Sequence, residues 1–294
     1  MRIRTWPLLL SIAATTIAVV SASTASGGDP APARRVVSMN PSLTRMIVAL
    51  GAADALVGID EYSARRVPSV ADRPLVGGLY SPSLEAIVAL RPDLVVVVPS
   101  VQQAVFREQL EVLGVEVLTL GESPVNFERV LAALAELGKR LGRTREARER
   151  ITAIRRTRAA VADATQEFER PRTVVVITRE PLYVAGAGSF LDEMLAVAGA
   201  VNLGARFDEP WPRASLEWLV EVAPEVIIDS APDSESAASY WSRWPSIPAV
   251  GSGRVVAVPA GEITLPGPDL DQSLLRLARA LHGDAFPVEP EGAP

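Results

Sequence analysis

One stretch of the sequence is written twice, and it constrains the fold more than any other feature. The first copy, SLEAIVALRPDLVVV, starts at Ser83, and the second, SLEWLVEVAPEVIID, starts at Ser215. In each copy a serine that can cap a helix precedes a first-turn glutamate, Glu85 or Glu217, which suits the positive end of the helix dipole. An apolar-rich helix then ends at a proline, and a β-branched run typical of a buried parallel strand follows. The repeated unit predicts two similar α/β lobes.

Helical and strand patterns alternate on both sides of the two copies, which indicates parallel sheets with helices on their faces. Residues 60–82, rich in Pro and Gly, read as a loop. The expected strands are 35–38, 56–59, 94–98, 115–120, 173–177, 226–228 and 255–258, and the other expected helices are 43–50, 102–113, 127–141, 190–198 and 270–281.

Residues 144–168 contain neither Gly nor Pro, and their Ala, Arg and Glu content favours helix. A helix of this length would reach roughly 37 Å at about 1.5 Å per residue. Its apolar positions sustain no heptad pattern, so a coiled coil is disfavoured. We predict a stiff connector between an N-terminal lobe, residues 26–143, and a C-terminal lobe, residues 169–286, with a disordered tail at 287–294.

The N-terminus has the pattern of a secretory signal peptide. Arg2 and Arg4 precede an apolar run to about Val20, and small residues follow. The alternative, a membrane anchor, is disfavoured because the apolar run is short for a span. We expect residues 1–25 to be cleaved after export.

Cysteine is absent from the chain. An exported protein of this kind has no disulfides and cannot carry the lipid anchor of a lipoprotein, so we expect a free periplasmic monomer. The formal net charge of −6 disfavours nucleic-acid binding.

Four pieces of sequence carry a family resemblance. They are VVSMNPSLTRMIVALGAADALVGI from Val36, VGGLYSPSLEAIVALRPDLVVV from Val76, WPRASLEWLVEVAPEVIID from Trp211, and the PGP turn at 266–268. In this order, the chain resembles periplasmic substrate-binding proteins of ABC importers for cobalamin, iron-siderophores and haem, and most of all the cobalamin-binding type. The resemblance implies two α/β lobes joined by a single long rigid α-helix, with the ligand cleft between the lobes. It also implies that Glu85 and Glu217 dock onto arginines of an inner-membrane ABC permease.

Four aromatic residues are candidates for the ligand cleft: Tyr62, Tyr80, Tyr183 and Trp211. They lie in loops or just after strands, and ligands of open α/β sheets bind at the carboxyl ends of strands. Flat aromatic faces suit a bulky ring-bearing ligand. Trp211 is the strongest candidate, because prolines flank it and it matches a cleft tryptophan of the cobalamin-binding type.

The choice of ligand follows from two departures from family patterns. Leu265 and Asp269 flank the PGP turn where siderophore-binding relatives carry arginines, which argues against a strongly anionic ligand gripped at that turn. The tryptophan expected near Leu79 is absent, and Tyr80 is the nearest substitute. A corrinoid such as cobalamin is the first expectation. An iron-siderophore or haem is the alternative, with Tyr62 or Tyr80 as the axial ligand of a haem.

Other functions find little support in the sequence. The only histidine is His282, expected at the surface or at a helix end, so a zinc or manganese receptor is disfavoured. The stretch Gly186–Ser189 lacks the third glycine of a dinucleotide fingerprint and reads as a turn. A hydrolase using carboxylates such as Asp208 and Glu209 is the remote alternative. We expect no enzymatic activity, no intrinsic cofactor and no metal site, and we assign Trp218 and Trp244 to the core.

Overall fold

The computed structural model describes residues 31–79, 81–99, 101–121, 124–232, 235–283 and 286. The predicted signal peptide, Tyr80 and the predicted tail at 287–294 lie outside the described residues. In the part that is described, no helix combines the length and the apolar character needed to cross a membrane.

The N-terminal sheet has four parallel strands in the order β2-β1-β3-β4. β3 is buried along its whole length, as its continuous apolar sequence predicts. The strands are β1 (Val36–Ser38), β2 (Leu56–Ile59), β3 (Leu94–Val97) and β4 (Val117–Thr119), and the helices are α1 (Pro41–Ala49), α2 (Glu61–Arg66), α3 (Leu84–Ala89), α4 (Val101–Val112) and α5 (Phe127–Arg140), with 3-10 turns η1 (Ala53–Ala55) and η2 (Pro68–Val70).

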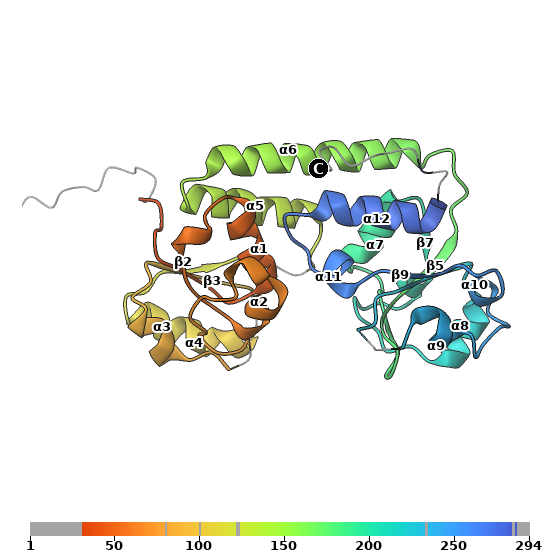
Figure 1. The fold of residues 1–294 in the computed structure, drawn as a ribbon, viewed down its shortest axis with the longest axis horizontal. Coiled ribbons are helices and arrows are strands. Elements are labelled where there is room, and N and C mark those ends of the chain that lie inside the picture. The colour runs from red at the N-terminus through yellow and green to blue at the C-terminus, as the bar shows by residue number, and fades with distance from the viewer. Residues whose placement is uncertain are drawn as a thin grey trace, which may run out of the picture. The chain divides into compact units, whose positions relative to one another are not determined.

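The C-terminal sheet has five strands, in which β6 is antiparallel to β5 and the other pairings are parallel. Each sheet and its helices form one lobe, so the predicted two-lobed α/β fold is confirmed (Figure 1). The strands are β5 (Arg172–Thr178), β6 (Tyr183–Val184), β7 (Val201–Asn202), β8 (Val226–Asp229) and β9 (Val255–Ala257), and the helices are α7 (Phe190–Val197), η3 (Leu203–Arg206), α8 (Leu216–Val222), α9 (Ala237–Trp241), α10 (Pro248–Gly251), α11 (Ala260–Ile263) and α12 (Leu270–His282).

The two copies of the repeated stretch start and end in the same way. The Ser83 hydroxyl accepts the backbone N–H of the third helical residue of α3 at 3.2 Å, and Ser215 caps α8 with the same distance. Both helices end at a residue in the left-handed conformation, Arg91 with φ 46° and Ala223 with φ 47°. A proline follows each of them and keeps the chain out of the right-handed helix. The predicted cap and stop are confirmed in both lobes.

The acid after each proline fastens the helix to the first strand of its sheet. Asp93 accepts the backbone N–H of Arg35 at 3.0 Å, and Glu225 accepts that of Arg172 at 2.8 Å. The same two arginines donate from their side chains to the last carbonyls of α3 and α8. The duplication therefore extends to an arginine that the sequence comparison of the two copies had not included.

The long helix α6 (Thr144–Ala164) spans 21 residues and ends before the predicted residue 168. It packs against α5 and α12, helices that belong to different lobes (Figure 1). Arg150 of α6 donates to the Pro268 carbonyl at 2.7 Å and pairs with Asp271 at the start of α12. That α6 acts as the rigid connector between the lobes stays a prediction.

The expectation of a loop over residues 60–82 is wrong in its first part, because α2 and η2 lie there. Asp60 caps α2 by accepting the backbone N–H groups of Tyr62 and Ser63 at 2.8 and 3.1 Å. Arg65 and Arg66 occupy the last turn, where the helix dipole favours cations. These cap and charge signals are present in the sequence. The surrounding prolines and glycines indicate a loop, however, and the helix is too short to show a clear apolar pattern of its own.

Candidate functional site

The N-terminal lobe presents α2 just after the carboxyl end of β2. Tyr62 is 45% exposed on this helix. The Arg65 guanidinium lies over its ring, 4.6 Å from the centroid, and adds a charge to the aromatic face. Helix α2 therefore combines an accessible ring with two arginines.

A cavity of about 460 Å³ lies at the carboxyl ends of β8 and β9. Its walls come from the loops after these two strands and from Arg66 of α2, so both lobes contribute to it. The guanidinium of Arg66 also lies close to Gly261, where an added Cβ would be 3.4 Å from it. This is the position at which open parallel sheets place their ligands.

Asp269, next to the PGP turn, is engaged by the N-terminal lobe. It pairs with Arg45 of α1, and the Arg45 side chain also reaches the Gly261 carbonyl at 3.5 Å. The Asp269 carboxylate, whose side chain is 43% exposed, is therefore already paired with an arginine of the other lobe.

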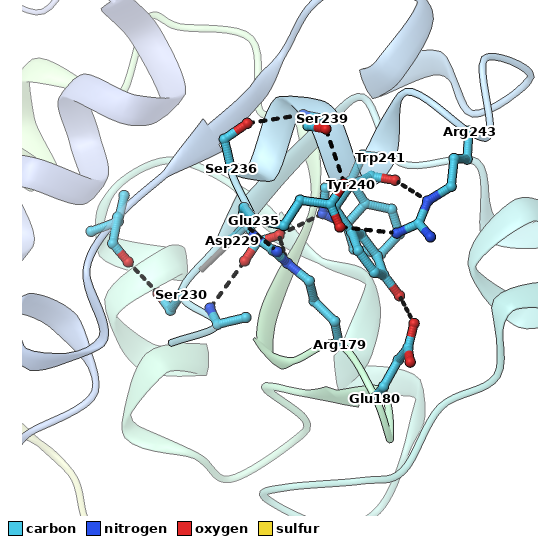
Figure 2. A network of polar contacts seen from close by, with 12 residues as sticks. Arg179, Glu180, Asp229, Ser230, Glu235, Ser236, Ser239, Tyr240, Trp241 and Arg243 are labelled. Atoms are coloured by element: carbon cyan, nitrogen blue, oxygen red, sulfur yellow. Dashed lines mark hydrogen bonds and ion pairs between the residues drawn. The ribbon is translucent and has the colours of Figure 1, made fainter. Parts of the chain in front are cut away.

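A buried polar network forms one wall of the cavity (Figure 2). Asp229 ends β8 and pairs with Arg179 at 3.0 Å, and both side chains are almost completely buried, with 1% and 3% of their surface exposed. The same carboxylate accepts the Trp241 indole N–H at 2.5 Å and the Ala231 backbone N–H at 3.0 Å. Arg179 also donates to the Glu235 carbonyl at 2.8 Å. Because its partners surround it, the buried charge is compensated and the loops after β5 and β8 are held in place.

Tyr240 links this network to the surface. Its ring lies beneath two guanidiniums, Arg179 at 4.8 Å and Arg243 at 4.2 Å from the centroid, and its hydroxyl donates to Glu180 at 3.3 Å. Burial raises the pKa of Tyr240 above its ordinary value, and the neighbouring Glu180 charge raises it further, whereas the two arginines oppose this. The phenol therefore stays protonated and keeps donating to Glu180 at neutral pH.

Tyr183 and Trp211 lie on one antiparallel ribbon, formed by residues 182–186 and 210–214 and called the β6 ribbon. Val184 donates to the Pro212 carbonyl at 3.2 Å, Gly186 to that of Pro210 at 2.9 Å, and Ala214 to that of Leu182 at 3.0 Å. Burial alternates over residues 181–184 and 211–215, with Tyr183 and Trp211 36% and 42% exposed and Leu182, Val184 and Pro212 buried. The sheet edge therefore shows an aromatic face to solvent.

The loop that carries Trp211 is held close against Gly186. A Cβ on Gly186 would lie 2.1 Å from the Glu209 carbonyl oxygen, so only glycine fits. The Trp211 ring contacts Phe190 edge-on, with centroids 6.5 Å apart. The turn predicted at 186–189 is thus what positions Trp211.

Glu85 and Glu217 occupy equivalent exposed positions in the first turns of α3 and α8. Hydrogen bonds from the backbone N–H of Glu217 itself and from the Ser215 hydroxyl lower the pKa of the Glu217 carboxyl below its ordinary value. The carboxylate of Glu217 is therefore charged at neutral pH and oriented toward the helix N-terminus.

The lowered pKa of Glu217 gives a measurable prediction. Ser215→Ala removes one of the hydrogen bonds and should raise that pKa, whereas Ser236→Ala, which removes the cap of α9, should leave it unchanged. Since the folded-state pKa is lowered, the stabilisation is present above the unfolded value of about 4.3 and is lost as pH falls through the folded value. Carbon-detected NMR titration of the Glu217 carboxyl measures the shift. An unchanged pKa in Ser215→Ala would contradict this assignment.

Several predicted positions have structural roles. Trp218 and Trp244 are half-buried and pack against the buried core of the C-terminal lobe, which includes Leu219 and Trp241, as expected. His282 ends α12, where its ring bonds the Ala198 carbonyl at 2.8 Å and contacts Phe168. Asp208 and Glu209 are exposed neighbours in the Trp211 loop. Over the described part of the chain, no cluster of three or more His, Cys, Asp or Glu residues is arranged to hold a metal ion.

Sequence reasoning missed the buried pair of Arg179 and Asp229 and the indole of Trp241. One signal was available, because Asp229 closes the second repeated strand at its carboxyl end. The partners come from positions 50 residues earlier and 12 residues later, and no local pattern joins them.

The chain is similar to binding proteins of known name. The family model described as periplasmic binding protein matches residues 36–260. A cobalamin-binding protein of Halobacterium salinarum is 29% identical, over 84% of this chain and 69% of its own length. An uncharacterized ABC transporter substrate-binding lipoprotein of Bacillus subtilis is 26% identical, over 86% and 81%. A solved periplasmic heme-binding protein from Pseudomonas aeruginosa is 28% identical with a TM-score of 0.71, over 87% of this chain and 95% of that one.

The family match runs from the first strand of the N-terminal sheet to just beyond the last strand of the C-terminal sheet. It includes both copies of the repeated stretch and the cavity at the ends of β8 and β9. The predicted resemblance is confirmed, and this chain belongs to the periplasmic binding protein family.

Proposed function

We propose that this protein is the periplasmic substrate-binding component of an ABC importer and that it captures a bulky ring-bearing ligand. The observation that carries the proposal is the set of exposed aromatic rings beside strand ends: Tyr62 on α2 and Tyr183 with Trp211 on the β6 ribbon. Exposed aromatics are costly to leave in water, and large rings offer them a matching flat apolar face. Tyr80 completes the proposed set.

A corrinoid is the first ligand we propose, and the cobalamin-binding relative from Halobacterium salinarum supports it. An iron-siderophore or haem is the alternative. For haem, two facts favour Tyr62 as the axial ligand: its ring is accessible, and a heme-binding protein is among the structural relatives. The relatives are binding proteins, so we propose that the chain performs no chemistry on its ligand.

The partner we propose is a permease of the inner membrane, which this protein would contact through Glu85 and Glu217. The ABC transporter substrate-binding relative supports this, and two exposed carboxylates in equivalent places suit a symmetric partner. The Bacillus relative is a lipoprotein, whereas this chain has no cysteine, so we propose a free monomeric form in the periplasm.

The test is a fluorescence titration of the exported protein with cyanocobalamin, haemin and a ferric siderophore. We expect saturable binding of one of them. Trp211→Ala should weaken it at least about tenfold, which corresponds to about 1.4 kcal/mol of lost ring contact. Trp211→Phe keeps an aromatic face and should lose less, and Val201→Ala, at an exposed position on β7, should change nothing. Tight binding that survives Trp211→Ala would contradict the assignment of that residue.

A further inference from the structure

Arg213 shares the aromatic face of the β6 ribbon. It lies opposite Tyr183 as an antiparallel bridge partner and two residues from Trp211, so the three side chains project on the same side. All three are exposed, whereas Pro212 and Ala214 between and beside them are buried. A cation therefore lies on the same face as the two rings proposed to hold the ligand.

A second cavity begins at the end of this ribbon. It has a volume of about 920 Å³ and is bounded by the turn after β5, the start of α8 and the end of α9. Its lining combines three arginines with three aromatic rings and one carboxylate: Arg179, Arg213, Arg243, Tyr240, Trp241, Trp244 and Glu180. Arg179 also lines the cavity shared by the lobes, so the two spaces adjoin.

The three arginines of this second cavity differ in how they are paired. Arg179 is paired with Asp229, and Arg243 lies 3.5 Å from Glu235 while its guanidinium covers Tyr240 and Trp244. Glu180 accepts from the Tyr240 hydroxyl. Within the residues that the structure describes, Arg213 takes part in no ion pair. Arg213 is thus the cation left available, and the half-paired Arg243 lines the same space.

We infer that Arg213, assisted by Arg243, recognises an acidic oxyanion on the edge of the ring-bearing ligand. A guanidinium binds carboxylates and phosphates through paired N–H groups, and its planar face stacks on neighbouring aromatic rings. This inference rests on the proposed function and adds that the ligand is an anion-bearing macrocycle. The residues flanking the PGP turn argue against a strongly anionic ligand bound at that turn only. The turn lies elsewhere in the lobe, so it does not bear on Arg213. A ring carboxylate, as in haem, and a phosphodiester, as in cobalamin, are the two sources of such a group.

The experiment compares ligand pairs that differ in the acidic group. Haemin is compared with its dimethyl ester, and cyanocobalamin with dicyanocobinamide, which lacks the phosphodiester together with the ribose and base attached to it. Tryptophan fluorescence gives the Kd of each for the wild type, for Arg213→Gln and for Arg148→Gln. The last is a matched control, because Arg148 is an exposed arginine on α6.

We expect the wild type to prefer the acidic member of one pair by at least tenfold and Arg213→Gln to lose that preference. Arg148→Gln should keep it, and raised salt should reduce it. Equal affinity for both members of the bound pair, unchanged in Arg213→Gln, would overturn the role of Arg213 and leave the proposed function standing. Failure of the wild type to bind any of the four compounds would instead overturn haem and the corrinoids as ligands, and the inference with them, and would leave only the siderophore alternative of the proposed function. Circular dichroism of each variant separates lost recognition from lost folding.

Discussion

Asp229→Ala is expected to destabilise the protein by about 3–5 kcal/mol, because it removes the buried Asp229 carboxylate from the buried Arg179 guanidinium. The substitution also removes the acceptor of the Trp241 indole, which is itself only 1% exposed. For a chain of this size, each kcal/mol lowers Tm by about 2–4 °C. Urea unfolding monitored by circular dichroism measures the loss of unfolding free energy, and thermal scans measure the change in Tm.

Two further variants show whether the buried charge is the cause. Glu262→Ala breaks the exposed pair with Arg276 and should cost no more than about 1 kcal/mol. Combining Asp229→Leu with Arg179→Met removes both charges and should restore part of the loss, since an apolar pair leaves no uncompensated charge. Equal losses for Asp229→Ala and Glu262→Ala would contradict the importance of this network.

Reversing both docking residues, Glu85→Arg with Glu217→Arg, is expected to abolish uptake of the ligand while its Kd stays unchanged. Both carboxylates are exposed in first turns, and arginine there would repel the permease arginines that we propose as partners. Ligand uptake by cells, or ATPase stimulation of the reconstituted transporter, measures docking. Fluorescence titration measures the Kd separately.

Matched reversals keep this test specific. The control variants are Glu221→Arg and Glu108→Arg. Glu221 lies on the same helix as Glu217, Glu108 lies on α4, the next helix after α3, and both side chains are exposed. These two should support uptake at close to the wild-type rate. Uptake that persists in the double docking variant would rule out the proposed contact, and a weakened Kd would show that these glutamates belong to the ligand site instead.

The sequence predicted the two lobes well because their determinants are local. The serine cap, the first-turn glutamate and the proline stop act within a few residues of one another, and the structure shows all three in both copies. Fully buried, apolar-rich strands such as β3 and β8 were equally plain. Short elements such as α2 and α9 were missed, since five or six residues give too little periodicity to separate a helix from a loop.

The site was predicted less completely, because its residues meet only through tertiary folding. Tyr183 and Trp211 were proposed from their placement beside strands and prolines, but their shared ribbon depends on pairing between distant segments. The position of Arg213 opposite Tyr183 depends on the same pairing, so the sequence alone did not predict it. The bond between Trp241 and Asp229 likewise requires α9 to pack over the end of β8.

The central claim, that this chain carries a bulky ring-bearing ligand, is tested most directly by native mass spectrometry of the protein purified from the periplasm of its own host. We expect one bound molecule with the mass and visible absorption of a corrinoid or an iron-bearing macrocycle or chelate, released on unfolding and depleted in Trp211→Ala. A bound ligand without a large ring, such as a sugar or an amino acid, would contradict it.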